Sequence, residues 1–386
     1  MAEPTPPAMT ELRLAARAAR PDGILDLSRS EPLPIPVADA CAARVGEEFM
    51  RARLYSPPGG LALAREAVAS YMSRRTGLDV GADRVAISAG AMQGISISLR
   101  ALVPPGTDVL VPVPYFHSHP KQVSMLGATP RFVDVRADRG VVTSEAIERS
   151  LTPSTSALLL CNPANPAGVA LGRAQLEAIL DVLPPSVAVI ADEVYAEYVY
   201  EGGFTSMLEV AASRDDGREV VVVNTASKTA GMPGWRVGSV VGTAELAPRV
   251  ASAAATLSGA PSTLGQLAYA AWLDEPPVLD RMAPYRPRLR DALEIAAGAG
   301  LTVRPPDATY YVWLTSDAEI GTGEAVLAVA RETGVLVWPG ALFGDPRSVR
   351  VSLSVPRRDL RAGLEGATDS WREIRLHDIP VSRSGG

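Results

Sequence analysis

Lysine is almost absent from this chain, and one of its two lysines stands where an amine could act as a nucleophile. The chain has 37 lysines and arginines, of which only Lys121 and Lys228 are lysine. Arginine stays protonated in proteins, whereas a lysine amine can lose its proton and attack a carbonyl group. Lys228 follows the apolar run 220–223 and precedes a turn rich in glycine and proline. We therefore predict that Lys228 lies at the end of a buried strand, where ligands gather in α/β sheets, with a solvated loop lysine as the alternative. Lys121 is predicted to be a surface lysine.

Two stretches contain groups suited to binding an anion. Residues 88–94 read Ser-Ala-Gly-Ala-Met-Gln-Gly and separate a predicted strand from a predicted helix. Small residues at a helix start leave backbone N–H groups free for an anion, although a plain strand–helix turn explains this loop equally well. It is not a Walker loop, because no Gly-Lys-Ser/Thr ending is present. Beside Lys228, the hydroxyls of Thr225 and Ser227 and the guanidinium of Arg236 would suit a phosphate-bearing aldehyde.

Two further polar side chains follow predicted strands. Asn165 lies in a loop with two Asn-Pro pairs, and the residue before a proline is pushed out of the helical region. This extended loop either directs Asn165 beyond the sheet edge or uses it to cap a turn. Asp192 follows the apolar run 187–191. A carboxylate there needs a positive partner, which a ligand could supply, unless it caps a helix.

The polar residues described above can form one site only if the strands that precede them end at the same edge of a sheet. From residue 85 onward, apolar runs alternate with helical patterns, and the predicted strands are 85–88, 109–112, 131–135, 157–161, 187–191, 220–224 and 237–241. Continuous apolar runs fit strands that are buried on both faces. The alternation predicts an α/β fold with a mainly parallel, seven-stranded sheet flanked by helices.

A second, smaller α+β domain is predicted from the rest of the chain. We place the large domain at 46–275 and build the small domain from 21–45 together with 276–386, leaving 1–20 as a loose N-terminal arm. Its predicted elements are helices over 279–297, 323–333 and 359–373 and strands over 301–304, 310–314, 335–338 and 348–353; a further helix is predicted over 37–50.

The composition excludes several classes of protein. A net charge of −6 and a pI near 5.3 argue against nucleic acid or an anionic membrane as partner. The cysteines, Cys41 and Cys161, indicate a reducing compartment. No signal peptide and no apolar stretch of roughly 18 residues is present, so we expect a cytoplasmic protein. With His117, His119 and His377 as the only histidines, we predict no metal site.

Together, these segments resemble the class I/II aminotransferase family, the fold-type I enzymes dependent on pyridoxal 5'-phosphate. The resemblance runs from about residue 25 to about residue 364. The matching segments are Leu-Tyr-Ser-Pro-Pro-Gly-Gly at 54–60, Ser-Ala-Gly-Ala-Met-Gln at 88–93, Val-Pro-Tyr-Phe at 113–116, Asn-Pro-Ala-Asn-Pro-Ala-Gly at 162–168, Ala-Asp-Glu-Val-Tyr at 191–195, Thr-Ala-Ser-Lys-Thr-Ala-Gly-Met-Pro-Gly-Trp-Arg at 225–236, Pro-Gly-Ala-Leu-Phe-Gly at 339–344 and Arg-Val-Ser-Leu at 350–353.

The resemblance implies a catalytic role for three residues. Lys228 would hold the cofactor as an internal aldimine and, once freed by the amino acid, would move the proton as a base. Asp192 would keep the pyridine nitrogen protonated, so that the ring accepts electrons. Tyr195, with Asn165, would hydrogen-bond the ring's 3' oxygen. Phe116 would stack on the ring, although a core phenylalanine remains an alternative.

The resemblance also implies how the phosphate and the substrate are held. The phosphate would lie against the backbone of Gly90, Ala91 and Met92, the hydroxyls of Thr225 and Ser227, and Arg236. Tyr55 would reach the phosphate of a neighbouring subunit, which implies a homodimer with shared active sites. Arg350 would bind the substrate's α-carboxylate, beside Asn165.

Departures from the family pattern bear on the substrate side chain. Met92 replaces a polar residue, and Ser30 replaces a glycine in the N-terminal segment, which closes over the substrate in the family. Ser30 and Arg29 are therefore candidate substrate contacts: Arg29 either contacts the substrate side chain or is simply solvated. The stretch 257–265 has no arginine, so the distal-carboxylate clamp of the aspartate-specific branch is missing there. We therefore expect a neutral, apolar or aromatic L-amino acid as donor and a 2-oxo acid as acceptor. Thr309 and Tyr310 also depart from the pattern near the substrate.

Three other functions are alternatives for this sequence. The first is another reaction in the same fold, such as β- or γ-elimination, decarboxylation or cyclisation, because substrate orientation decides which bond breaks. The second is an aminotransferase-like effector domain of a transcription regulator, for which about 20 preceding residues are too few to form a DNA-binding module. The third, a Rossmann dehydrogenase, lacks Gly-x-Gly-x-x-Gly after a strand.

Overall fold

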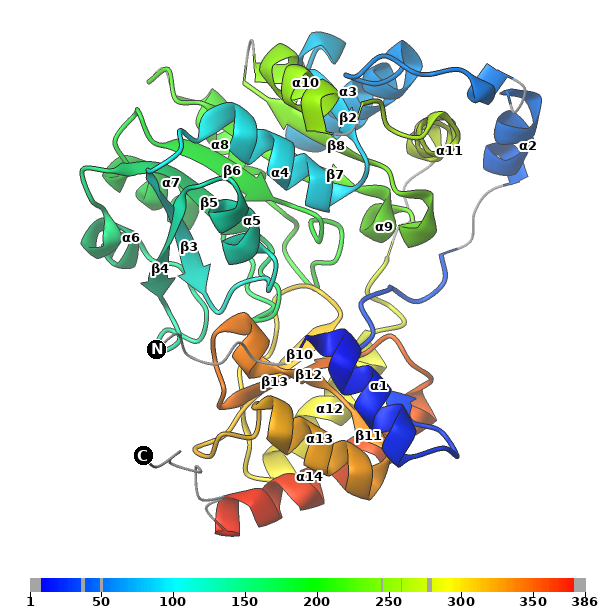
Figure 1. The fold of residues 1–386 in the computed structure, drawn as a ribbon, viewed down its shortest axis with the longest axis vertical. Coiled ribbons are helices and arrows are strands. Elements are labelled where there is room, and N and C mark those ends of the chain that lie inside the picture. The colour runs from blue at the N-terminus through cyan, green and yellow to red at the C-terminus, as the bar shows by residue number, and fades with distance from the viewer. Residues whose placement is uncertain are drawn as a thin grey trace.

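The computed structural model describes residues 8–35, 39–48, 51–214, 216–243, 246–257, 259–275 and 280–377. Figure 1 shows two bodies of secondary structure, one around a large sheet and one around a small sheet, with the N-terminal helix α1 packed on the second. Within these residues no helix is both long and apolar enough to cross a membrane.

The large sheet contains seven strands in the order β2-β8-β7-β6-β5-β3-β4. Strands β3 to β7 pair in parallel, whereas β8 runs antiparallel to both of its neighbours. This confirms the predicted α/β fold with a mainly parallel, seven-stranded sheet. The strands are β2 (Val85–Ser88), β3 (Asp108–Val113), β4 (Thr129–Asp134), β5 (Thr155–Cys161), β6 (Ala188–Asp192), β7 (Val220–Thr225) and β8 (Gly238–Gly242).

Helices bury both faces of this sheet. Side chains alternate along each strand, so Leu158 and Leu160 of β5 join one apolar cluster while Leu159 joins the other. The continuous apolar runs follow from this double burial. The helices are α3 (Ala62–Thr76), α4 (Ala91–Leu102), α5 (His119–Met125), α6 (Ser144–Ser150), α7 (Arg173–Val182), α8 (Met207–Ala212), α9 (Ala226–Thr229), α10 (Leu246–Leu257) and α11 (Thr263–Asp274).

The small sheet has its own apolar core. Its four strands are antiparallel in the order β12-β13-β10-β9, and a separate parallel pair joins β1 to β11. The strands are β1 (Leu25–Asp26), β9 (Thr302–Val303), β10 (Tyr311–Thr315), β11 (Val335–Leu336), β12 (Trp338–Pro339) and β13 (Ser348–Ser352). The helices are α12 (Arg286–Gly298), α13 (Gly323–Thr333) and α14 (Arg357–His377), while α2 (Asp39–Glu48) packs on α11.

Two expectations about the helices were wrong. The segment expected to be a loose arm contains helix α1 (Met9–Ala19), which buries Met9, Leu12 and Ala16 against the small sheet's core. Helix α12 begins at Arg286, later than predicted, because residues 281–285 form turns and Pro287 suits the first turn of a helix. Positions 36–38, 49–50 and 276–279 of the predicted helices and boundaries lie outside the described residues. The domain boundaries remain a prediction.

Candidate active site

A cavity of roughly 250 Å³ lies beyond the carboxyl ends of β6 and β7. Each of the four stretches that the sequence singled out contributes to its wall, because parallel strands end at the same sheet edge. The lining residues are Ser30, Glu31, Ala91, Met92, Ile95, Phe116, His117, Asn165, Asp192, Val194, Tyr195, Thr225, Ser227, Lys228, Pro233 and Arg236.

Lys228 enters this cavity from the short helix α9, directly after β7. Thr225 caps that helix by accepting a hydrogen bond from the Ser227 N–H at 3.2 Å, which fixes where Lys228 projects. The Lys228 Nζ donates to the carbonyl oxygen of Ser30. Burial lowers the pKa of the Lys228 amine, and the nearby Arg350 adds to this effect. A lowered pKa makes the neutral, nucleophilic amine more available. Lys121, by contrast, is exposed, as predicted.

Asp192 ends β6 and is only 4% exposed. Its Oδ2 lies 3.2 Å from Nε2 of His119, and its Oδ1 accepts a hydrogen bond from the Val194 N–H at 3.4 Å. His119 begins helix α5 and was not among the predicted site residues. The one signal in the sequence that could have indicated His119 is its position three residues after Phe116, a predicted site residue. In the structure the Phe116 ring packs edge-on against the His119 imidazole, with the ring centroids 5.2 Å apart.

Arg350, on strand β13 of the small sheet, does not line the cavity itself but contacts two residues of its wall. Its Nη1 donates to Asn165 Oδ1 at 2.9 Å and its Nη2 donates to Ser30 Oγ at 3.1 Å, and the residue is 1% exposed. Asn165 Nδ2 in turn donates to the hydroxyl of Tyr195 at 3.5 Å. The two sheets therefore meet at this chain of polar contacts, which connects Arg350 to the residues beside Lys228.

The opposite end of the cavity forms a cradle for an anion. Gly90 precedes helix α4 with a φ of 82°, and a Cβ added there would lie 2.8 Å from Arg236 Nη2. Arg236 Nη1 lies 3.5 Å from Ser227 Oγ, whose partner Thr225 Oγ1 is 3.1 Å away. A helix N-terminus, a guanidinium and two hydroxyls suit a dianionic phosphate. With Lys228 and Asp192 further in, these residues fit pyridoxal phosphate.

Some predicted residues do not line the cavity. Tyr55 is completely exposed, and Arg29 is half exposed with its Nε 4.0 Å from a carboxylate oxygen of Glu31. Gly90 contributes only through its close approach to Arg236. Met92 does line the cavity and is 39% exposed. His117 and Glu31 line it without having been predicted.

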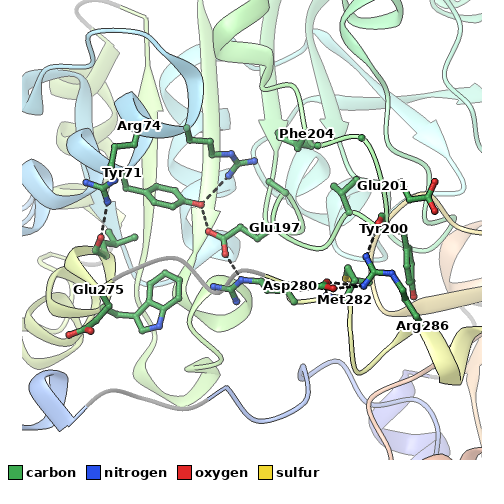
Figure 2. Close-up of a pocket in the computed structure, with 18 residues that line it drawn as sticks. Tyr71, Arg74, Glu197, Tyr200, Glu201, Phe204, Glu275, Asp280, Met282 and Arg286 are labelled. Carbon is green, nitrogen blue, oxygen red and sulfur yellow. Dashed lines mark hydrogen bonds and ion pairs between the residues drawn. The ribbon is translucent and has the colours of Figure 1, made fainter.

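A larger cavity of roughly 750 Å³ lies between α3, the end of α11 and the loop after β6, and contains none of the predicted residues (Figure 2). Several of its charged side chains pair with one another. Tyr71 donates to Glu197, which also binds Arg281 at 2.6 Å, and Arg286 binds Asp280 at 2.7 Å. These pairings leave the 250 Å³ cavity as the better candidate for chemistry.

Comparisons with known proteins agree with this geometry. The sequence profile of the family described as aminotransferase class I and II matches residues 22–366. The aspartate/prephenate aminotransferase of Thermus thermophilus is 32% identical over 322 residues, covering 81% of each chain. The aspartate aminotransferase of Geobacillus stearothermophilus is 27% identical over 372 residues, covering 93% of each. The solved structure of a double mutant of Thermus thermophilus aspartate aminotransferase superposes with a TM-score of 0.84 at 26% identity, covering 95% of this chain and 97% of that one.

Proposed function

This chain belongs to the class I and II aminotransferase family and is a pyridoxal-phosphate-dependent aminotransferase, and from this premise we propose which of its residues carry the reaction. The observation that supports the assignment is the convergence of Lys228, Asp192 and the Arg236 cradle on one cavity. The bound cofactor supplies an electron sink for the carbanion formed at the substrate's Cα.

Lys228 is the covalent attachment point and the base. Burial lowers the pKa of the Lys228 amine, so the neutral amine can take a proton from the substrate's Cα and then pass it on as the amino group is transferred. Asp192 supplies a fixed negative charge that holds a proton on the cofactor's ring nitrogen. His119 keeps that carboxylate in place through the 3.2 Å contact.

Six further side chains complete the cofactor site. Thr225, Ser227 and Arg236 bind the phosphate together with the N-terminus of α4, and the ring of Phe116 covers the cofactor's face. Tyr195 and Asn165, joined by a 3.5 Å contact, hydrogen-bond the 3' oxygen.

Arg350 binds the α-carboxylate of the substrate. Its present partners, Asn165 and Ser30, are neutral, so a carboxylate would form stronger, charge-assisted bonds with the guanidinium. Asn165 stays within reach of the same carboxylate.

The amino donor has a neutral side chain. Met92, Phe116 and Pro233 form an apolar part of the cavity wall. His117 also lines the cavity, and burial lowers its pKa to about 3, so its imidazole stays neutral. The cationic side chains among the lining residues are Lys228 and Arg236, both already assigned. A distal carboxylate would therefore find no free cation in the cavity wall and would face Glu31.

Aspartate is the second candidate donor. Relatives such as the Geobacillus stearothermophilus protein are named aspartate aminotransferases, and Arg29 lies beside the cavity residue Ser30. A rotation of Arg29 away from Glu31 would bring a cation to the cavity mouth.

The enzyme acts as a homodimer. Tyr55 is a large side chain that is completely exposed in one chain, and burial of Tyr55 against a second copy would remove that apolar surface from water. Analytical ultracentrifugation tests this state, and a monomer that retains full activity contradicts it.

Spectroscopy of the half-reaction tests the proposed chemistry and its donor. Adding single amino acids to the purified enzyme should convert the cofactor to pyridoxamine phosphate, faster with leucine or phenylalanine than with aspartate. Release of ammonia, thiol or carbon dioxide without that product would instead assign elimination or decarboxylation.

A further inference from the structure

Tyr311 connects the two ends of the active site. It begins strand β10, is fully buried, and places its ring 3.9 Å from the guanidinium carbon of Arg350. Its phenolic oxygen lies 3.0 Å from that of Tyr195. The ring thus contacts the group assigned to the substrate's carboxylate, and the hydroxyl contacts the group assigned to the cofactor's 3' oxygen.

A strained residue holds Tyr311 in this position. Thr309 is buried with a φ of 69°, a conformation that is a genuine outlier for a β-branched residue. Its N–H donates to the Tyr198 carbonyl at 2.6 Å, and its Oγ1 accepts from the Tyr311 N–H at 3.2 Å. Strain of this kind persists only where the surroundings fix the backbone, and it is concentrated at functional sites.

The direction of the hydrogen bonds follows from the charges around the two phenols. Burial raises the pKa of Tyr311, but Lys228, Arg350 and hydrogen bonds from Tyr195 and Tyr310 outweigh burial and lower it overall. Burial raises the pKa of Tyr195 well above its ordinary value. Tyr195 therefore keeps its proton and donates it, while Tyr311 accepts.

We propose that Tyr311 is a positioning residue of the transamination reaction, whose ring supports the guanidinium of Arg350 and whose phenolic oxygen orients the hydroxyl of Tyr195. The inference rests on the proposed roles of those two partners. It adds one side chain, Tyr311, that positions both the residue assigned to the substrate's carboxylate and the residue assigned to the cofactor's 3' oxygen.

The neighbouring Tyr310 supplies a matched control. Its hydroxyl donates to the Ser30 carbonyl at 2.8 Å, and the Tyr311 hydroxyl also lies 3.3 Å from that oxygen. The direct contact with the Tyr195 hydroxyl belongs to Tyr311. Tyr311→Phe and Tyr310→Phe therefore each remove one hydroxyl near Ser30, and only the first removes the partner of Tyr195.

The first experiment follows tyrosinate absorbance near 295 nm while the full-length apoenzyme is titrated with base. One phenol should ionise before the others in the wild type, and Tyr310→Phe should keep this step at a somewhat higher pH, because it loses one hydrogen bond to the Tyr311 oxygen. This early step should be absent from Tyr311→Phe and should move to higher pH in Lys228→Met, because Lys228 favours the tyrosinate. A wild-type titration without an early step, or an early step that survives in Tyr311→Phe, overturns the inference.

The second experiment uses the holoenzyme and separates the contribution of the Tyr311 ring from that of the Tyr311 hydroxyl. Tyr311→Phe keeps the ring, so KM for amino acid and 2-oxo acid should stay within about twofold. In this variant Tyr195 gives its proton wholly to the cofactor, and the midpoint of the cofactor's spectral pH titration should fall by on the order of half a pH unit. Tyr310→Phe should leave that midpoint in place.

Tyr311→Leu removes the ring and should raise both KM values about tenfold, since a desolvated cation–π contact is lost. Equal kinetics in Tyr311→Leu and Tyr311→Phe, or an unmoved midpoint in Tyr311→Phe, contradicts the inference. The apoenzyme titration does not depend on turnover. An early phenol in a protein that fails to transaminate would therefore count against the proposed function and not against the placement of Tyr311.

Discussion

The imidazole Nε2 of His119 lies 3.2 Å from the carboxylate Oδ2 of Asp192, and both side chains are at least 95% buried. The pair joins helix α5 to the end of strand β6. Because a buried carboxylate is costly without partners, this contact orients Asp192 before any cofactor binds. It also gives a role to a histidine for which the sequence had indicated none.

Removing the imidazole should weaken the Asp192 site. His119→Leu leaves the carboxylate with only weak hydrogen bonds, from the Val194 N–H and the Cys161 thiol, and we expect cofactor affinity and kcat each to fall about tenfold or more. His119→Gln, whose amide nitrogen can take the place of Nε2 and still donate, should retain most of both. Fluorescence titration of the apoenzyme with pyridoxal phosphate measures affinity. Equal loss in the two variants would mean that the hydrogen bond has no role.

Replacing Arg350 should impair substrate binding and spare the cofactor. Arg350→Lys keeps the charge but cannot bind a carboxylate through two parallel bonds. We expect KM for amino acid and 2-oxo acid to rise on the order of 100-fold, the cost of disrupting a buried charge-assisted pair. Arg347→Lys, three residues earlier in the chain, is the control. An unchanged KM would remove Arg350 from the carboxylate site.

A positive charge at Met92 should change the donor preference. Met92→Lys places an ammonium in the cavity wall, and we expect kcat/KM for aspartate relative to leucine to rise about tenfold. Met125→Lys adds the same charge at an exposed position of α5, so it controls for net charge. A wild-type enzyme that already favours aspartate would assign the distal carboxylate to Arg29 or to a second subunit.

Stability should fall as pH rises from about 4.5 through about 7 because of Glu193. Burial raises its pKa from 4.5 to about 7, against the opposing effects of Arg75 and of hydrogen bonds from Ser206 and the Met207 N–H. Between these pH values the folded state keeps a proton that the unfolded state has released. Stability is therefore full below about pH 4.5 and falls by on the order of 3 kcal/mol by pH 8.

Glu193→Gln removes this dependence. Its apparent Tm should rise relative to wild type between pH 5 and pH 8, by on the order of 5 °C. Glu177→Gln, on the exposed face of α7, should follow the wild type. Parallel curves for wild type and Glu193→Gln would show that Glu193 is ionised at neutral pH.

The large sheet could be predicted because its strands are buried on both faces, and such strands have continuous apolar sequences between turns. All seven predicted strands of the large sheet occur; 85–88 has the predicted bounds, and the other six are shifted by one or two residues at one or both ends. Helix α1 was missed because prolines dominate the start of the chain, although Met9, Leu12 and Ala16 have helical spacing.

The residues of the candidate site also fall into those that could be predicted from the sequence and those that could not. Asp192 and Lys228 could be placed because each follows its own strand, and parallel strands share an edge. His119 and Tyr311 could not, because their contacts depend on how α5 packs on the large sheet and how the small sheet packs on the large one. No local pattern in the sequence encodes that packing.

Borohydride trapping tests the central claim most directly. The holoenzyme is reduced, digested and analysed by mass spectrometry for phosphopyridoxyl-lysine. Since the chain has two lysines, the measurement has few outcomes. We predict the label on Lys228, with none in Lys228→Arg and full labelling in Lys121→Arg. Label on Lys121, or on neither lysine, would contradict the account.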